Sequence, residues 1–361
     1  MKEKLFFSLF ILSFLALGFA KAQNIQFEDA NFKATLLLAS PENKIAKDTN
    51  GNFVAIDVNG DREISQAEAL NVYYLDISKA QDIASIKGIE YFTNLTELNC
   101  EGVALESLDV SKNTNLQSLG LKSTRIQTLD ISKNINLQGL YLDSTKIQTL
   151  DLSKNINLQW LGLSSTGIKT LDISKNINLQ LLGLGSIEIK TLDISKNINL
   201  LALELSGTGI QTLDVSKNIS LLALGLGSTG IKTLDVSKNI DLKGLYLNNT
   251  GIQTLDVSHN TKLEFLELND CIGLTSLYMK NGVKKTFSFK HLEGYNFNNT
   301  NLNYICCDKG EIDAVKKHMQ NLASKNLLAE GWQFSNLTVT SDCGTKPQEK
   351  TVLSKKTSEK L

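Results

Sequence analysis

The sequence predicts a β-rich solenoid built from tandem repeats, and three observations support this fold class. A 21-residue unit opens at Leu108 and recurs without a gap at Leu129, Leu150, Leu171, Leu192, Leu213, Leu234 and Leu255. Each copy holds two short clusters in which apolar residues alternate with other residues, and a period of two is typical of strands. One copy is too small to bury its own apolar side chains, so the copies must stack and share a core.

Residues 129–149 show the pattern of one copy. The side chains expected to point inward are Leu129, Ile131, Leu137, Leu140, Leu142 and Ile147. A turn that contains Ser132, Lys133 and Asn134 separates the two clusters. We therefore expect two short strands in every copy, a first strand at Leu-Asp-Ile and a second strand at the following Leu-x-Leu.

The two clusters of this copy resemble the short repeats of secreted bacterial leucine-rich-repeat proteins, a group that includes the internalins. The motif is Leu-x-Ile-x-x-Asn-x-x-Leu at 129–137, followed by Leu-x-Leu-x-x-Thr-x-Ile at 140–147. The resemblance covers about residues 75–345. It implies a leucine-rich-repeat solenoid of short parallel β-strands with little helix, a small helical N-terminal cap and an α/β C-terminal cap. It also implies protein recognition through one strand face.

The Asn of the first cluster is present in every copy, from Asn113 to Asn260. We expect these side chains to form a buried ladder that satisfies backbone groups at the turn, because an unpaired buried polar group costs roughly 1–3 kcal/mol. After the second cluster most copies have Thr, as at Thr145, where the related repeats usually have Asn. Thr has a hydroxyl and no amide, so the second turn should be built differently.

Residues 1–22 have the features of a secretory signal peptide. Lys2 and Lys4 precede an apolar run over residues 5–19, and Ala20-Lys21-Ala22 resembles a cleavage site. The apolar run of about 15 residues is shorter than the roughly 20 residues that span a bilayer. We therefore expect a mature chain from Gln23 that is secreted, periplasmic or on the cell surface, with no transmembrane span. The formal net charge of −1 argues against a nucleic-acid-binding surface.

Residues 23–74 should form an N-terminal cap with a short helix over Phe27–Leu38 and a possible calcium loop. Oxygen-bearing side chains follow the EF-hand spacing at Asp57, Asn59, Asp61, Glu63, Ser65 and Glu68. The sequence departs from that pattern at Arg62, where such a loop normally has Gly to make a sharp turn. The alternative is an Asx-rich turn followed by a helix from about Ser65, with Glu68 as the acid of a capping box. Residues 75–107 are a degenerate copy of the repeat.

The first strand presents the same residues in every copy. Each copy has an Asp, a Ser two residues later and then a Lys, except that His259 replaces the last Lys. The parallel rows of Asp and Lys offset each other's charge, so we expect a solvated face without a specific partner. Cation binding along the Asp row is the alternative.

The second strand differs from copy to copy at its outward positions. The predicted partner-binding face consists of Tyr141, Trp160, Leu181, Glu204, Tyr246, Phe265 and Glu267. Exposed aromatic side chains are typical of binding hot spots, and the two Glu should set the charge preference for a protein partner. Three alternatives remain at this stage: neutral drift with Gly filling unused positions, sugar stacking on Tyr141, Trp160 and Tyr246, and a structural spacer without a partner.

Residues 277–345 should form a C-terminal cap. Closing strands are expected around Leu277, Phe287, Phe289 and Leu292, then a helix over Gly310–Lys325 and an edge strand over Trp332–Thr340. A disulfide should join Cys306 or Cys307 to Cys343, with Cys306–Cys343 as the predicted pair. Cys100 and Cys271 fall at core positions and should be buried thiols. Residues 346–361 read as a disordered tail.

Catalytic chemistry has no support in the sequence. His259, His291 and His318 are isolated, and neither a Gly-x-Ser-x-Gly elbow nor a phosphate-binding loop is present. The sequence therefore predicts a non-enzymatic chain with a protein partner, and calcium is the one cofactor considered.

Overall fold

The computed structural model describes residues 23–80, 82–282 and 295–344. The chain forms two compact units, and unit 1 ends at Leu140 while unit 2 begins at Tyr141. The predicted signal peptide and the predicted C-terminal tail lie outside the described residues. The strands expected around Phe287, Phe289 and Leu292 and the isolated His291 also lie outside them. The domain boundaries drawn from the sequence stay predictions.

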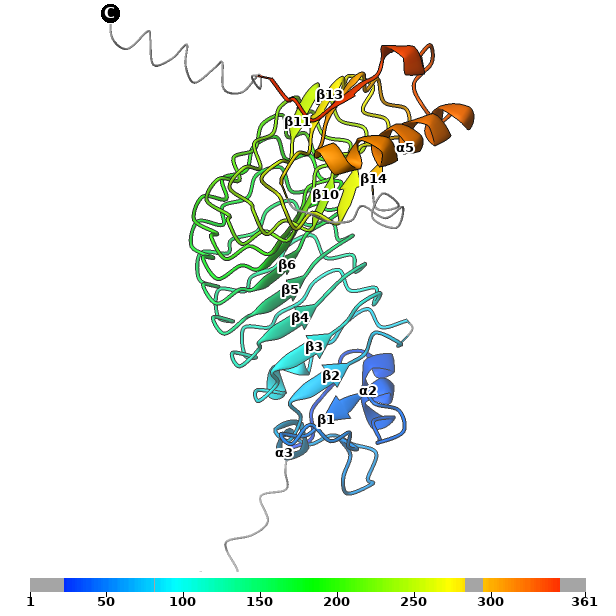
Figure 1. The fold of residues 1–361 in the computed structure, drawn as a ribbon. Helices are drawn as coiled ribbons and strands as arrows, with labels where there is room; N and C mark the ends of the chain where they lie inside the picture. The colour runs from blue at the N-terminus through cyan, green and yellow to red at the C-terminus, as the bar shows by residue number, and fades with distance from the viewer. Residues whose placement is uncertain (1–22, 81, 283–294, 345–361) are drawn as a thin grey trace, which may run out of the picture. The chain divides into compact units, whose positions relative to one another are not determined.

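Unit 1 combines the N-terminal cap with the first turns of the solenoid. Its elements are α2 (Ala30–Leu37), β1 (Ala46–Lys47), α3 (Gln66–Ala69), β2 (Tyr74–Asp76), the 3₁₀-helix η1 (Ile89–Tyr91), β3 (Glu97–Asn99) and β4 (Ser118–Gly120). β1 pairs antiparallel with β2, whereas β2, β3 and β4 are parallel neighbours. The register places Leu75, Leu98 and Leu119 in one row, and all three are buried. Figure 1 shows these strands as successive rungs.

Unit 2 continues the solenoid and ends in the C-terminal cap; β5 (Gly139–Tyr141) spans the point where the units divide. Its elements are β6 (Trp160–Gly162), β7 (Leu181–Gly183), β8 (Ala202–Glu204), β9 (Ala223–Gly225), β10 (Gly244–Tyr246), β11 (Thr254–Asp256), β12 (Phe265–Glu267), β13 (Ser276–Tyr278), β14 (Tyr295–Asn296), β15 (Tyr304–Cys306), η2 (Lys309–Glu311), α5 (Ile312–Ser324), η3 (Phe334–Asn336) and β16 (Thr338–Thr340). β6 to β10, β12 and β14 form one sheet in this order, and β11, β13, β15 and β16 form a second sheet.

The core of unit 2 is a stack of aliphatic columns. The central residue of each strand from β6 to β10 is a Leu, and the register places Leu161, Leu182, Leu203, Leu224 and Leu245 in one buried row. This arrangement confirms the predicted solenoid of short parallel strands with little helix.

The Asn of the first cluster forms the predicted ladder. Asn197 Nδ2 donates to the carbonyl oxygens of Asn176 at 2.9 Å and Ile173 at 3.0 Å, and both acceptors belong to the preceding copy. The same pair of bonds recurs at Asn134, Asn176, Asn218, Asn239 and Asn260. Each Asn therefore ties its copy to the one before it, and the prediction of a buried ladder is confirmed.

The second turn is built differently, as the change to Thr predicts. Thr208 Oγ1 donates to the carbonyl oxygen of Leu205 at 2.7 Å, three residues earlier in the same copy. Thr124, Thr145, Thr166 and Thr229 make the equivalent bond. In these copies the hydroxyl thus closes a turn locally, whereas Thr250 Oγ1 lies 3.3 Å from Cys271 Sγ of the following copy.

The prediction of a strand in the first cluster is wrong for the copies that open between Leu108 and Leu234. Of the eight clusters, only that of β11, at Leu255, is a strand within the described residues. The backbone groups there are used by other bonds: the Ile173 carbonyl accepts from the Asn176 backbone at 3.0 Å and from the Asn197 side chain. Leu129, which was expected to point inward, is only half-buried.

The repeated Asp of the first cluster has a turn-forming role. Asp172 Oδ1 accepts the backbone N–H of Ser174 at 2.9 Å, and Asp109, Asp130, Asp151, Asp193, Asp214, Asp235 and Asp256 repeat this bond. The hydrogen bonds from Ser174 lower the pKa of Asp172, and Lys175 adds to this effect. The turn therefore explains the residue without any bound cation.

The N-terminal cap begins with the predicted short helix. Asp29 caps α2, because its Oδ1 accepts the backbone N–H groups of Asn31 at 2.8 Å and Phe32 at 3.1 Å. The side chains of Phe32 and Leu36, on the inner side of the helix, are fully buried.

The C-terminal cap has the predicted disulfide, which joins Cys306 to Cys343. Cys100 and Cys271 are buried free thiols, as expected, and Cys307 is a third. The predicted helix is confirmed as α5, which buries Val315, Met319 and Leu322. The edge strand expected over Trp332–Thr340 is shorter than predicted, because η3 occupies part of that range and only β16 is a strand.

Replacing Asn197 with Ala should lower the free energy of unfolding by about 2 kcal/mol, because two buried carbonyl groups each lose one of their two donors. The matched control is Asn199→Ala in the same copy: Asn199 Nδ2 donates to Ile177 at 3.0 Å, but it is exposed. We expect the control to change stability by less than about 0.5 kcal/mol. Chemical denaturation of both variants checks this, and equal losses would contradict a stabilising role for the buried column.

Candidate functional site

The outward side chains of β6 to β10 and β12 in unit 2 form two rows. The register aligns Trp160, Leu181, Ala202, Ala223, Gly244 and Phe265 in the first row and Gly162, Gly183, Glu204, Gly225, Tyr246 and Glu267 in the second. Tyr141 lies next to Gly162, since the following residue, Leu142, donates its backbone N–H to the Gly162 carbonyl at 2.8 Å. The structure thus brings all the sequence-predicted face residues onto one surface, which we call the strand face. Figure 1 shows β6 and β10 within it.

Large apolar side chains lie towards the two ends of the strand face. Leu181 is 41% exposed and Phe265 is 49% exposed, whereas Tyr141, Trp160 and Tyr246 are half-buried. Strands in a sheet are about 4.8 Å apart, so the four steps from β7 to β12 separate Leu181 and Phe265 by roughly 19 Å. Small residues fill the first row between them: Ala202, Ala223 and Gly244.

Several glycines of the strand face provide space for neighbouring side chains. A Cβ at Gly162 would be 2.5 Å from Asp143 Oδ2, and a Cβ at Gly225 would collide with Glu204 Oε2. At Gly244 it would be 2.9 Å from the Tyr246 ring. These glycines are covered, so the interpretation that they fill unused positions does not hold for them. Sequence reasoning missed this because each pairing depends on a side chain in another row or copy.

The two acidic residues of the strand face are held in place by hydrogen bonds. Glu204 Oε1 accepts the Ser206 backbone N–H at 2.7 Å, and Glu267 Oε2 accepts from Asn248 Nδ2 at 2.6 Å. Glu204 is exposed and Glu267 is half-buried. Both carboxylates therefore have a defined orientation while remaining accessible.

A third row, at the ends of the strands, links the copies. Ser164 and Ser206 accept the backbone N–H groups of Gly185 and Gly227 in the following copies, both at 3.1 Å. Asn248 accepts from Asn269 in the same way at 2.9 Å. This row has a structural role, so the residues open to recognition are those of the strand face itself.

The predicted calcium loop in unit 1 makes its sharp turn despite Arg62. Arg62 has a φ of 62°, in the left-handed region that favours glycine. Asp57 stabilises the turn, because its two carboxylate oxygens accept the backbone N–H groups of Gly60 at 2.8 Å and Arg62 at 2.9 Å. The side chains of Asn59 and Asp61 also accept backbone N–H groups of the loop.

Glu68 forms the capping box that was the alternative interpretation of this segment. Its Oε2 accepts the Ser65 backbone N–H at 2.8 Å, and the Glu68 backbone N–H donates to Ser65 Oγ at 3.2 Å. Glu63 forms an ion pair with Lys33 at 2.7 Å. Across the described ranges, no three Asp, Glu, His or Cys side chains converge as metal ligands. The donor types and their order fit calcium, and its binding stays a prediction.

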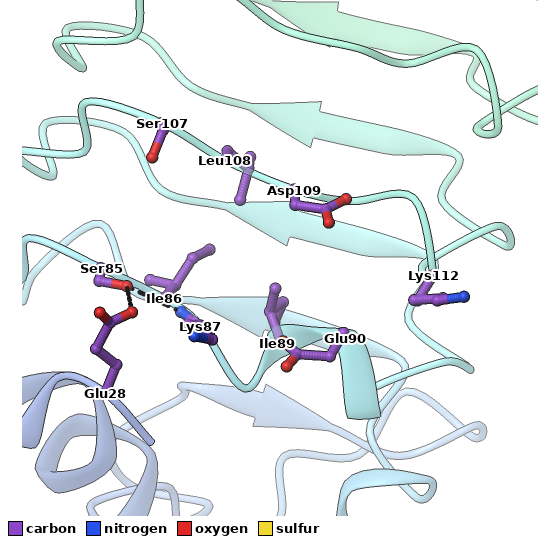
Figure 2. Close-up of a pocket in the computed structure, with 10 residues that line it drawn as sticks. All are labelled: Glu28, Ser85, Ile86, Lys87, Ile89, Glu90, Ser107, Leu108, Asp109 and Lys112. Carbon is purple, nitrogen blue, oxygen red and sulfur yellow. Dashed lines mark hydrogen bonds between the residues drawn. The ribbon is translucent and has the colours of Figure 1, made fainter. Parts of the chain in front are cut away.

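A separate hollow of about 350 Å³ lies in unit 1 between the N-terminal cap and the degenerate repeat. Its lining residues are Glu28, Ser85, Ile86, Lys87, Ile89, Glu90, Ser107, Leu108, Asp109 and Lys112. Figure 2 shows Ser107, Leu108 and Asp109 facing the segment from Ser85 to Glu90. The Ser85 hydroxyl donates to Glu28 at 3.2 Å. Three acidic and two basic residues largely balance one another, so the hollow indicates no particular ligand.

The histidines within the described residues are explained by packing and exposure. His318 packs edge-on against Phe297, with ring centroids 5.7 Å apart, and burial lowers the pKa of His318. His259 is exposed, and its Nδ1 is 3.4 Å from the hydroxyl of its chain neighbour Ser258. Neither environment has the base and orienting group that activate a nucleophile.

Comparison with known proteins gives similar solved structures only. No family model and no curated protein matches the chain. The functional domain of InlJ from Listeria monocytogenes has 20% identity and a TM-score of 0.44, covering 82% of this chain and 80% of that one. A leucine-rich-repeat protein from Leptospira interrogans has 21% identity and a TM-score of 0.48, with 76% and 80% covered. At such identities the likeness concerns the fold alone.

The repeat, the strands and the asparagine column together define the class of protein. Copies of 21 residues, each with a buried Leu-x-Leu strand and an Asn that bonds to the previous copy, form a leucine-rich-repeat solenoid. In the part of the chain that the structure describes, no helix has the length and apolar character needed to cross a bilayer.

The pairing of Glu204 with Gly225 can be tested by a double-mutant cycle. Ala in place of a strand Gly usually stabilises a protein by about 0.5–1 kcal/mol. In a Glu204→Ala background, we expect Gly225→Ala to increase the free energy of unfolding by this amount. In the parent, which has Glu204, we expect no increase, because the new methyl group displaces the carboxylate.

Gly183→Ala is the matched control for this cycle. Its Cβ would be 3.5 Å from Ser164 Oγ, an ordinary contact, so the substitution should be stabilising with either residue at position 204. Chemical denaturation measures all the variants. A gain at Gly225→Ala that is independent of Glu204 would show that the carboxylate does not occupy this space.

Proposed function

We propose that the chain is a non-enzymatic recognition protein outside the cytoplasm that binds a protein partner through the strand face. The observation that carries this proposal is the contrast between the fixed frame of the repeat and the varied outward positions. The exposed Leu181 and Phe265 lie at the same strand position in different copies, where other copies have Trp160, Ala202, Ala223 or Gly244.

The chemistry of the strand face favours a partner with basic and apolar groups. Glu204 and Glu267 have defined orientations, and Asp143 adds a third carboxylate beside Gly162. No Lys or Arg occupies an outward position of β6 to β10 or β12. A cationic side chain could pair with Glu204 while apolar residues contact the large side chains at either end, which is how hot spots on interfaces are usually arranged.

The test is capture of extracellular and cell-surface proteins by the mature chain from Gln23, followed by affinity measurement with the captured protein. We expect the combined variant Leu181→Ser, Glu204→Gln and Phe265→Ser to weaken binding at least about tenfold, because it removes exposed groups from the centre and both ends. These side chains are more exposed than Trp160 and Tyr246, so the fold should remain intact.

The matched control is Ile272→Ser with Leu327→Ser, two exposed apolar residues outside the strand face and outside the turns after the ladder asparagines. Binding that is equal in the parent and the strand-face variant would contradict the proposal and favour a spacer. Retention of glycans, lost on replacing Tyr141, Trp160 and Tyr246, would instead favour the carbohydrate-binding alternative.

The N-terminal loop supports a second proposal, a structural calcium site. The donors would be Asp57, Asn59, Asp61, Ser65 and Glu68, with Glu63 contributing at the intermediate position. The left-handed Arg62 supports it, because the sequence departs from the EF-hand pattern at that residue alone, and there the backbone turns as a Gly would. A calcium ion would stabilise the cap of unit 1 without a signalling role.

Calcium binding should raise the melting temperature of the mature chain at about millimolar concentration, in the range of extracellular calcium modules. Glu68→Gln should abolish the shift, because Gln can retain the cap but lacks the carboxylate charge. Magnesium at the same concentration serves as the ionic control. If calcium leaves the parent unchanged even in large excess, the loop acts as an Asx-rich turn and capping box only.

A further inference from the structure

A column of exposed isoleucines runs along the first turn of successive copies in unit 2, and the strand face does not include it. Its members are Ile156, Ile177, Ile198, Ile219 and Ile240, which are 51–58% exposed. We call this column the isoleucine stripe. Exposed apolar residues are common singly, whereas a regular row of them is characteristic of interaction surfaces.

The fold itself does not require isoleucine at this position. Each Ile follows the ladder Asn and is the second residue of a turn, such as the one closed by Leu221 N donating to the Asn218 carbonyl at 3.2 Å. Such turn positions accept most residues and usually hold polar ones. The first and last regular copies have Thr114 and Thr261 here. The turn therefore tolerates a polar residue, and the stripe is confined to the middle copies.

Two backbone carbonyl groups of the stripe, those of Ile156 and Ile177, are already hydrogen-bonded. Asn178 Nδ2 donates to the Ile156 carbonyl at 3.1 Å, and Asn199 Nδ2 donates to the Ile177 carbonyl at 3.0 Å. Carbonyl groups satisfied in this way do not need water, so these two acceptors stay paired when the stripe is covered. Ile is also stiff at χ1, which reduces the entropy lost when its side chain is immobilised.

We propose that the isoleucine stripe is a self-association surface whose occupant is the stripe of a second copy of this chain. The spacing of the stripe is set by the solenoid, and consecutive isoleucines are always one copy apart. A second copy has the same spacing, so all five isoleucines can meet their counterparts at once. An unrelated globular surface has no reason to match this period. This proposal is independent of the strand face.

Charge favours one of the two symmetric arrangements of the copies. Lys154, Lys175, Lys196, Lys217 and Lys238 form an exposed row along one side of the stripe, two residues before each Ile. If the stripes ran antiparallel, one Lys row would lie on the other. If the stripes ran parallel, a two-fold axis along the stripe would relate the two copies. The Lys row of each copy would then face the side of the other copy that carries Asn178 and Asn199. The stripes should therefore run parallel, with each Ile facing the same residue of the other copy.

The test is the oligomeric state of the mature chain, measured by sedimentation velocity over a wide concentration range. The parent should form a dimer, and Ile177→Thr with Ile198→Thr and Ile219→Thr should raise its dissociation constant at least about a hundredfold. Thr occurs naturally at this position in two copies, so the variant should fold, which its melting curve checks. Thr261→Ile lengthens the stripe and should tighten the dimer.

The control variant is Leu181→Thr with Phe265→Thr, which removes apolar side chains from the strand face and should dimerise like the parent. In a separate experiment, Ile156→Cys should cross-link to the same residue of the second copy under mild oxidation. A cross-link that instead requires Ile156→Cys together with Ile240→Cys would overturn the parallel arrangement. A monomeric parent at every concentration, or equal dimerisation of the Thr variant, would overturn the proposal itself.

Discussion

The hydrogen bonds of the ladder asparagines are the interaction on which the rest of unit 2 depends. Each amide donates to two carbonyl groups of the previous copy, and the donors themselves are buried. These bonds fix how one copy sits on the next, and the Leu columns then pack in register. The same bonds use a carbonyl of the Leu-Asp-Ile segment, which is not a strand in these copies.

This frame leaves two kinds of position without a structural task, and the chain treats them in opposite ways. Outward strand positions differ between copies, from Leu181 to Ala202 to Phe265, so the strand face has an individual pattern. The turn position after each ladder Asn is almost constant, so the isoleucine stripe has a repetitive one. A varied surface suits a specific partner, and a periodic surface suits a partner with the same period. The two proposals therefore assign different tasks to different sides of one solenoid.

Most of the fold could be predicted from the sequence because the period is long and repeated. The second strands, the Asn ladder and the Cys306–Cys343 disulfide all agree with the structure. The first strand could not be excluded, because alternation of apolar residues does not reveal that side chains have taken the backbone hydrogen bonds. The rows of the strand face followed from the period, but the covering of Gly225 by Glu204 depends on a rotamer in another copy. The isoleucine stripe was not predicted, because its residues lie outside the two apolar clusters and the sequence alone does not show that they are exposed.

The fit of side chains over glycines has a consequence for how such a gene can change. Nearly identical copies invite unequal recombination, which adds or removes 21 residues without breaking the ladder. Asp143 and Glu204, however, each occupy the space beside a glycine of the next copy, Gly162 and Gly225. A crossover that places Glu204 or Tyr246 at this strand position after either carboxylate would bring a bulkier residue against it, whereas Gly183 would not. The order in which copies follow one another is therefore constrained as well as their number, because only copies with Gly at this position fit directly after Asp143 or Glu204.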